Sequence, residues 1–245
     1  MLMRARLETC GLVDIADRLE AGARLGLEDG VRLFDAPDLL AVGWLANRER
    51  ERRHAGRTFF NHNIRIEATN VCVANCLFCS FARLKPGDPG AYTMSLEQAW
   101  DKLRQREDQA LTEIHVVNGL HPDLPFSYYL DLLRGFRRIR PDVHLKCFTA
   151  VEIAFFADLY AKSDEQVLRE LMEAGLNSLP GGGAEVFAER VRRKISHDKC
   201  GTDRYLAIHR TAHGLGMRSN VTMLYGHIET AAERVDHMLR VRALQ

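Results

Sequence analysis

Three cysteines close together on one segment are the residues with the clearest capacity for chemistry. Cys72, Cys76 and Cys79 have the spacing C-x3-C-x2-C within NVCVANCLFCSF, directly after the extended segment FFNHNIRIEATN (59–70). Thiols stay reduced in the cytoplasm, so clustered cysteines there point to a metal or redox centre before a disulfide. The loop must coil to bring three sulfur atoms onto one small object.

The number of cysteines leaves two kinds of metal centre open. A structural zinc ion takes four ligands, and His62 and Cys147 are the candidates for a fourth. An iron–sulfur cluster also commonly takes four cysteines, so three would leave one metal corner vacant for a reacting molecule. Phe78, inside the loop, can shield such a cluster from water.

Composition excludes several other classes of protein. The 245 residues carry a net charge of +1, with 46% hydrophobic and 27% charged residues, which is ordinary for a globular protein and predicts no binding to nucleic acid. No apolar run reaches the length of a membrane-spanning helix, and the N-terminus lacks the apolar core of a signal peptide. We expect a cytoplasmic protein without membrane insertion.

The segments that must position the cysteine loop alternate between strand and helix. Residues 8–60 show helical spacing of apolar residues, and five strand–helix units follow. The expected strands are 59–70, 113–119, 143–150, 176–183 and 218–226, and the expected helices are 93–108, 126–141, 163–175, 203–216 and 228–245. Such alternation predicts an α/β fold with a parallel sheet, either open or curled into a barrel.

The cysteine spacing, with an aromatic residue just before the third cysteine, resembles that of the radical S-adenosylmethionine enzymes. The resemblance implies a full or partial (β/α) barrel of the TIM type, with Cys72, Cys76 and Cys79 holding a [4Fe–4S] cluster. It also implies that the vacant iron binds S-adenosylmethionine, which is cleaved to a 5′-deoxyadenosyl radical. We expect residues 1–58 to form a helical segment packed on the barrel of residues 59–245. An eight-unit barrel needs three further units, so we expect the chain to be a fragment.

Motifs at the strand ends narrow the resemblance. GLHPDLPF, HLKCFTAVEI, SLPGGGAEVF and TMLYGHIETAAERVDH resemble the enzymes of the futalosine route to menaquinone and the related FO synthase, and most of all the aminofutalosine-forming members. The implied reaction adds the adenosyl radical to 3-[(1-carboxyvinyl)oxy]benzoate with loss of carbon dioxide. The alternatives are dehypoxanthine futalosine cyclase or FO synthase-like activity, a zinc-binding protein without catalysis, or an inactive fragment. Asn118 departs from the pattern, because a glycine is expected there.

Four residues at or after the ends of the second and third strands are candidates for the site. Asn118 and Gly119 close a strand where backbone can approach the methionine part of the cofactor, or they form a plain turn. His121 is a candidate contact for substrate or cofactor, against the alternative of a surface histidine. Glu152 is a candidate partner for a ribose or amino group, or a charge that favours the start of a helix.

The later strands contribute a second group of candidates. Gly182 and Gly183 allow backbone to lie beside adenosine, with Glu185 nearby, and no Lys-Ser/Thr pair follows that would make a nucleotide-binding P-loop. Tyr225 can stack on adenine or pack in the core. The expected catalytic residues are therefore His121, Glu152 and Tyr225.

Partners follow from the implied chemistry. The substrate is a small enolpyruvyl benzoate ether with two carboxylates, for which Arg65 and Arg210 are candidate ligands. A low-potential donor such as a ferredoxin or flavodoxin is expected to reduce the cluster. Cys147 lies within an expected strand and is interpreted as a small core residue.

Overall fold

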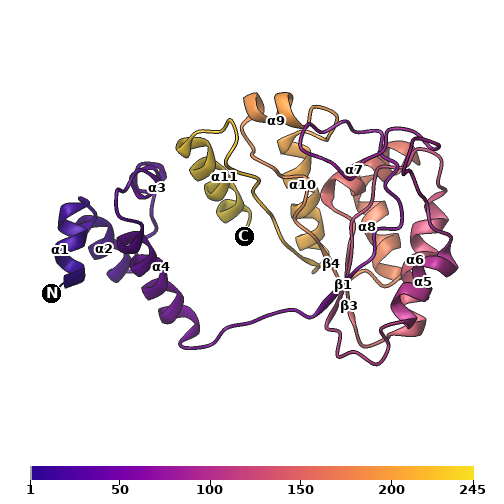
Figure 1. Ribbon diagram of the computed structural model, residues 1–245, viewed down its shortest axis with the longest axis horizontal. Coiled ribbons are helices and arrows are strands. Elements are labelled where there is room, and N and C mark those ends of the chain that lie inside the picture. Colours follow the sequence, from indigo (N-terminus) through magenta and orange to yellow (C-terminus); the bar gives the residue numbers. More distant parts are fainter. Residues whose placement is uncertain (1) are drawn as a thin grey trace. The chain divides into compact units, whose positions relative to one another are not determined.

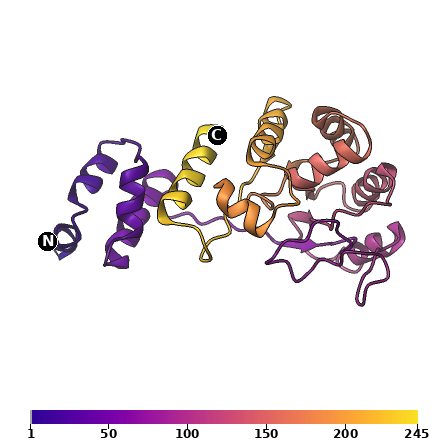
Figure 2. The same ribbon diagram turned by 90° about the horizontal axis from the view of Figure 1, so that it is seen from above.

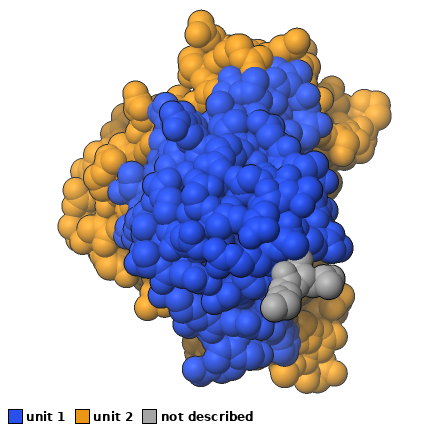
Figure 3. Space-filling view, turned by 90° about the vertical axis from the view of Figure 1, so that its left-hand side faces the viewer, with its two compact units in different colours: residues 1–60, 225–243, 245 blue, residues 61–224, 244 orange. Residues whose placement is uncertain are grey.

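A computed structural model describes residues 2–245 of the chain, which divide into two compact units. The helical unit comprises residues up to Phe60 together with Tyr225–Ala243 and Gln245, and the sheet unit comprises Asn61–Leu224 with Leu244 (Figure 3). The sequence predicted a division at residues 58 and 59 and assigned 225–243 to the barrel. In the structure those C-terminal residues make their contacts within the helical unit, and packing of the N-terminal segment on the barrel stays a prediction.

The helical unit is built from short helices around a small apolar core. Its helices are α1 (Leu2–Thr9), α2 (Val13–Glu20), α3 (Leu27–Phe34), α4 (Leu39–His54) and α11 (Ala231–Leu244). The core consists of Leu7, Leu12, Ile15, Ala16, Ala41 and Leu45. Gly30 lets α11 lie against α3, because a Cβ there would stand 2.5 Å from Cγ1 of Val235. Gly11, at a positive φ of 64°, lies in the turn between α1 and α2.

The sheet unit confirms the predicted α/β fold. Its strands are β1 (Asn63–Arg65), β2 (Glu113–Val116), β3 (His144–Cys147), β4 (Ser178–Leu179) and β5 (Arg218–Ser219). They form one sheet in the order β1-β2-β3-β4-β5, and every neighbouring pair is parallel. The strands are shorter than their apolar segments predicted, since residues at both ends of each segment leave the ladder for the connecting loops.

Helices cover one side of this sheet. The helices of the sheet unit are α5 (Leu96–Arg104), α6 (Phe126–Ile139), α7 (Ala150–Leu159), α8 (Asp164–Glu173), α9 (Glu189–Ile195) and α10 (Thr202–Gly214). Figure 2 shows α5, α6, α7, α8 and α10 side by side in a curved row, the arrangement of a partial (β/α) barrel. Ile64, Ile114 and Leu145 are buried on the helix-facing side of the sheet. The helices α7 and α9 were not predicted.

Capping groups explain where several helices begin. Ser95 and Gln98 form the capping box at the start of α5, with the Ser95 hydroxyl accepting from the Gln98 N–H at 3.2 Å. Ser163 caps α8 in the same way. Gly135 of α6 leaves room for Trp100 of α5, whose ring would otherwise lie 2.0 Å from a Cβ. The capping boxes define where α5 and α8 begin, and the absence of a side chain at Gly135 allows α5 and α6 to pack closely.

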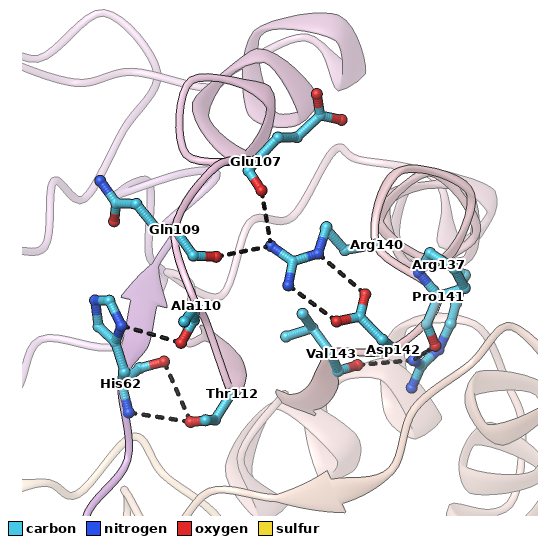
Figure 4. A network of polar contacts seen from close by, with 10 residues as sticks. All are labelled: His62, Glu107, Gln109, Ala110, Thr112, Arg137, Arg140, Pro141, Asp142 and Val143. Carbon is cyan, nitrogen blue, oxygen red and sulfur yellow. Dashed lines mark hydrogen bonds and ion pairs between the residues drawn. The ribbon is translucent and has the colours of Figure 1, made fainter.

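Two arginines tie down the loops that enter β2 and β3 (Figure 4). Arg140 pairs with Asp142 at 2.9 Å and donates to the carbonyl of Gln109 at 3.2 Å. Arg137 donates to the carbonyl of Val143 at 2.7 Å. These contacts stabilise the amino ends of the strands. The loops that could form a site follow the opposite, carboxyl ends. Within residues 2–245, no helix is both long and apolar enough to cross a membrane.

Candidate functional site

A cavity of about 430 Å³ lies in the sheet unit at the carboxyl ends of the strands. It brings together every residue that the sequence predicted to bind metal or cofactor. These are Cys72, Cys76, Phe78, Cys79, Asn118, Gly119, Glu152, Gly182, Gly183 and Glu185. Segments up to 113 positions apart in the chain therefore meet around one space, as the parallel topology requires.

The cysteine loop has no regular secondary structure and is held by side chains instead. Asn70 accepts from the N–H of Tyr92 at 2.8 Å and donates to the carbonyl of Gly90 at 2.9 Å. The guanidinium of Arg83 donates to the carbonyls of Pro89 and Ala82, each at 2.9 Å. These hydrogen bonds fold the loop back on itself. They position the segment that carries the three thiols, although it contains no helix or strand.

A second anchor comes from the segment after α9. The N–H of Leu77 donates to the carbonyl of Ile195 at 3.0 Å, and the N–H of Asn75 donates to the carboxylate of Asp198 at 2.8 Å. Lys199 follows directly and pairs with Glu185 at 2.6 Å, with its Nζ also 5.1 Å from the ring centre of Phe78. The site therefore contains a mostly buried cation beside the thiols.

The three thiols differ in exposure. Cys76 is buried, Cys72 is partly buried and Cys79 is exposed. Burial raises the pKa of the Cys76 thiol, and the positive charge of Lys199 opposes that rise. Burial likewise raises the pKa of Cys72, while backbone N–H groups of Leu120 and Ala74 oppose it. Thiolates here need a compensating positive charge, which a bound metal centre supplies.

The cysteine loop does not arrange its thiols as the ligands of a single metal ion. Across residues 2–245, no three His, Cys, Asp or Glu side chains come together as ligands of one metal ion. Thiols that bind different irons of a cluster do not have to meet at one point. Neither candidate fourth ligand lies at the cavity: the His62 ring is 3.1 Å from the carbonyl of Ala110, and Cys147 is completely buried in β3.

The end of β2 is fixed to the cysteine loop by Asn118 and Gly119. The Asn118 Oδ1 accepts from the N–H of Ala68 at 2.7 Å, which leaves its buried Nδ2 with no partner among the described residues. A Cβ on Gly119 would lie 2.2 Å from the carbonyl oxygen of Val71. Gly119 is thus required for the loop to approach, and the Asn118 amide offers a free donor at the cavity.

Glu152 is both a helix cap and a wall of the cavity. Its carboxylate accepts from the N–H of Thr149 at 2.7 Å, from the Thr149 hydroxyl at 2.9 Å and from the N–H of Asn118 at 2.9 Å. Burial raises its pKa to about 7, although these hydrogen bonds oppose the shift. The carboxylate therefore holds β2 and α7 together, which agrees with the helix-charge alternative.

The glycine segment keeps side chains out of the cavity. A Cβ on Gly182 would lie 3.2 Å from Cγ2 of Thr149, and one on Gly183 would lie 2.4 Å from Cγ2 of Val151. Gly183 also has a φ of 88°, in the left-handed region that favours glycine. The backbone at Gly182 is consequently exposed to whatever occupies the cavity.

The other two predicted catalytic residues, His121 and Tyr225, lie in different units. His121 is buried, accepts from the N–H of Asp123 at 3.1 Å through Nδ1, and does not line the space. Tyr225 belongs to the helical unit, is 64% exposed and lies with Arg234 5.5 Å from its ring centre. His121 is thus not a surface side chain, and the catalytic roles of His121 and Tyr225 stay predictions.

Sequence reasoning missed two residues that shape the site, Lys199 and Arg83. Lys199 lies in a loop after α9, and the residues around it form no recognisable sequence motif. Arg83 is one of many arginines, and only the folded loop reveals that its guanidinium gathers backbone carbonyls. Arg210, a candidate carboxylate ligand, lies exposed on α10, whereas Arg65 lines the cavity.

A parallel sheet with three thiols on the loop after its first strand defines a class of protein, the radical S-adenosylmethionine enzymes. Residues 66–241 match the model of the Radical SAM superfamily, and the chain belongs to that family. It is 47% identical over 234 residues to the aminodeoxyfutalosine synthase of Thermus thermophilus, a match that covers 96% of this chain and 63% of that protein.

Further comparisons agree with this assignment. The chain is 45% identical to the aminodeoxyfutalosine synthase of Streptomyces coelicolor, over 95% of this chain and 60% of that protein. It spans less than two thirds of the length of either synthase. The crystal structure of methylornithine synthase, PylB, shares the fold with a TM-score of 0.70 and 15% identity, over 94% of this chain and 64% of that one.

Members of this family use a [4Fe–4S] cluster and S-adenosylmethionine, so both expected cofactors are confirmed for the family. The cavity suits them. Three cysteines line it, together with Asn118, whose Nδ2 has no partner among the described residues, and Gly182, which has no side chain. A cluster requires the sulfur ligands. S-adenosylmethionine requires hydrogen-bond donors and space that is not filled by side chains.

Proposed function

We propose that the chain forms the catalytic core of an aminodeoxyfutalosine synthase. The reaction is transfer of the 5′-deoxyadenosyl group to 3-[(1-carboxyvinyl)oxy]benzoate, with carbon–carbon bond formation and loss of carbon dioxide, to give 6-amino-6-deoxyfutalosine in menaquinone biosynthesis. The identity to two synthases supports this substrate. The single observation that carries the proposal is the meeting of all ten predicted metal- and cofactor-binding residues in one cavity.

In this proposal Cys72, Cys76 and Cys79 hold the cluster through thiolates. When bound, the cluster and S-adenosylmethionine supply the 5′-deoxyadenosyl radical. The Nδ2 of Asn118 donates to the cofactor's carboxylate, because it is the buried donor at this cavity that lacks a partner in the described chain. Lys199 reduces the cost of placing thiolates in a partly buried loop, which makes it a positioning residue.

The glycine segment and the aromatic residues orient the reactants and limit water. Gly182 allows close approach of the adenosine, and Glu185 holds Lys199 at 2.6 Å so that the cation stays beside the loop. Phe78 and Phe81 both line the cavity and present apolar surface to it. Excluding water protects a radical from competing hydrogen donors and strengthens the electrostatic contacts.

The partner and the compartment belong to the same proposal. A low-potential ferredoxin or flavodoxin would deliver the electron where the cysteine loop reaches the surface, since Cys79 is exposed and Leu77 is 70% exposed. Reduced thiols and a reduced electron carrier fit the cytoplasm.

Cluster chemistry is tested by anaerobic reconstitution with iron and sulfide, followed by an assay with S-adenosylmethionine, reductant and the enol ether, read by mass spectrometry. We expect a brown protein that forms the adenosylated product. Cys76→Ala should lose both the iron–sulfur absorbance and the product, whereas Cys10→Ala, in the helical unit, should keep both.

Other results would contradict the proposal. A colourless protein that binds one zinc tightly would favour the non-catalytic alternative. Consumption of dehypoxanthine futalosine in place of the enol ether would favour the cyclase. Equal loss of iron in the Cys10 and Cys76 variants would show that the loop is not the cluster site.

A further inference from the structure

One register position of the sheet carries a polar or charged residue on every strand. The ladder pairs Arg65 with His115 and His115 with Lys146, and it continues through Ser178 to Arg218. We call these five residues the polar row: Arg65, His115, Lys146, Ser178 and Arg218. Paired positions in neighbouring parallel strands place their side chains on the same face of the sheet.

The polar row faces away from the helices. The residues next to it along the strands, such as Ile64, Ile114 and Leu145, are buried on the opposite, helix-facing side. At the last strand, Ser219 contacts His209 of α10 at 2.8 Å, so the preceding Arg218 lies on the other face. The row therefore lines the concave interior of the partial barrel.

The charges of the row are only partly neutralised. Lys146 pairs with Glu113 at 2.7 Å, and Arg65 pairs with Glu67 at 3.1 Å. Within the described part of the chain, Arg218 has no carboxylate at ion-pair distance. Three cations thus face two carboxylates. His115, between Arg65 and Lys146, has its pKa lowered by burial and by the charge of Arg65, so it stands as a neutral hydrogen-bonding group.

The row lies just below the cavity of the cysteine loop. Arg65 itself lines that cavity, as do Glu67 and Val117, which come two positions after Arg65 and His115 and lie just beyond the ends of β1 and β2. Two residues of strand span roughly 7 Å, which is about the length of a benzene ring with one substituent. The Arg65 side chain is 63% exposed, so its guanidinium is accessible from the cavity side.

We propose that the polar row is the recognition site for the ring carboxylate of an aromatic acid, with Arg65 as its principal ligand. This inference rests on the proposed function, because it takes the acceptor to be an aromatic dicarboxylate. A guanidinium matches a carboxylate with two parallel hydrogen bonds, and Arg218 and His115 lie in the same row. The ring carboxylate is remote from the reacting double bond, so binding it at the polar row leaves the enol ether toward the cysteine loop.

Direct binding of unreactive probes tests the assignment on the reconstituted protein with S-adenosylmethionine bound. The probes are 3-(carboxymethoxy)benzoate, which carries both carboxylates, and phenoxyacetate, which lacks the one on the ring. We expect wild type to bind the first more tightly, measured by calorimetry. Arg65→Gln should weaken that binding by roughly 10-fold or more and leave phenoxyacetate nearly unchanged, since a charged hydrogen bond to the ring carboxylate is lost.

Controls separate recognition from folding. Arg134→Gln removes an exposed arginine of α6 that pairs with Asp131, and it should bind both probes as wild type does. Arg65→Lys should recover part of the preference, because the charge is kept while the bidentate geometry is lost. Matching thermal unfolding of the variants shows that the sheet is intact, and Arg218→Gln provides a second variant of the row.

Two outcomes overturn the inference: equal binding of both probes by wild type, or an unchanged preference in Arg65→Gln and Arg218→Gln. The failure of the proposed function is distinct from either. A protein that binds the dicarboxylate through Arg65 but forms no product from the enol ether would keep the row as an aromatic carboxylate site and reject the synthase.

Discussion

Glu152 shows how one side chain joins fold and site at the scale of a residue. It lies at the cavity, yet its oxygens are occupied by backbone and hydroxyl donors from Thr149 and Asn118. A carboxylate with these three bonds has little capacity left for a ligand. We therefore expect Glu152 to act mainly by stabilising the contact between β2 and α7. Because its carboxyl group titrates, this contribution can be measured as a dependence of protein stability on pH.

The pKa of Glu152 is raised from 4.5 to about 7 by burial. Between these values the folded protein keeps a proton that the unfolded chain releases, so the free energy of unfolding falls as pH rises from about 4.5 to about 7. The shift corresponds to roughly 3 kcal/mol. Glu152→Gln should lose this slope. Denaturant unfolding of the metal-free protein at pH 4.5, 6 and 7.5 measures it, and parallel curves for both proteins would contradict the prediction.

The sequence grouped the expected metal- and cofactor-binding residues, which all line one cavity, better than it grouped the expected catalytic residues. Cysteines, glycines and an asparagine at strand ends are constrained by backbone position, which the strand pattern reveals. His121 and Tyr225 also follow strands, but the direction of their side chains depends on loop geometry. Lys199 and Arg83 act through contacts with segments far along the chain or with backbone carbonyls, and no local pattern predicts such contacts.

At the scale of an element, the contact between the end of β2 and the cysteine loop depends on Gly119. Gly119→Ala should destabilise the protein by roughly 1–3 kcal/mol or more, because its Cβ would lie 2.2 Å from the Val71 carbonyl oxygen. Gly43→Ala is the matched control: Gly43 lies within α4 with nothing within 4 Å of a Cβ, and the change should stabilise by roughly 0.5–1 kcal/mol.

Thermal unfolding and iron content after reconstitution measure both variants. Gly119→Ala should retain less iron than wild type, because the loop that carries the thiols cannot approach the strand. Normal iron content together with normal stability in this variant would show that the loop packs in another way. A destabilised Gly43→Ala would mean that α4 does not have the helical backbone described here.

Amphipathic helices and β-branched strands were predictable, whereas α7 and α9 were not. The sequence of α7, AVEIAFFADL, is apolar on nearly every side, and almost all of it is buried. A helix without a polar face has no 3.6-residue pattern, so the segment resembled a loop between the third strand and the next helix. The short helix α9, ERVRRKI, is dominated by charged residues and offers too few apolar positions for a helical pattern.

At the scale of the whole molecule, the chain leaves the helical unit through an extended and exposed segment, residues 55–62 (Figure 1). Limited trypsin digestion should cut first after Arg57, because exposed chain outside regular structure is the preferred site of cleavage. Arg52 and Arg53 lie within α4, and both pair with Glu49. Mass spectrometry of the first fragments identifies the bond, and Arg57→Gln should slow its cleavage. A first cut inside the sheet unit would contradict this.

The helical unit is discontinuous in sequence, and this has a consequence for how the protein is made. The core of α1, α2 and α4 can form as soon as the first 54 residues leave the ribosome. The partners of α3 arrive much later: Val235 covers Gly30, and Arg242 donates to the carbonyl of Leu25 at 2.9 Å. During translation the surface of α3 that contacts α11 therefore stays exposed to solvent until the sheet unit has been synthesised. A helix that is synthesised after the sheet unit therefore completes a unit that began to fold before it.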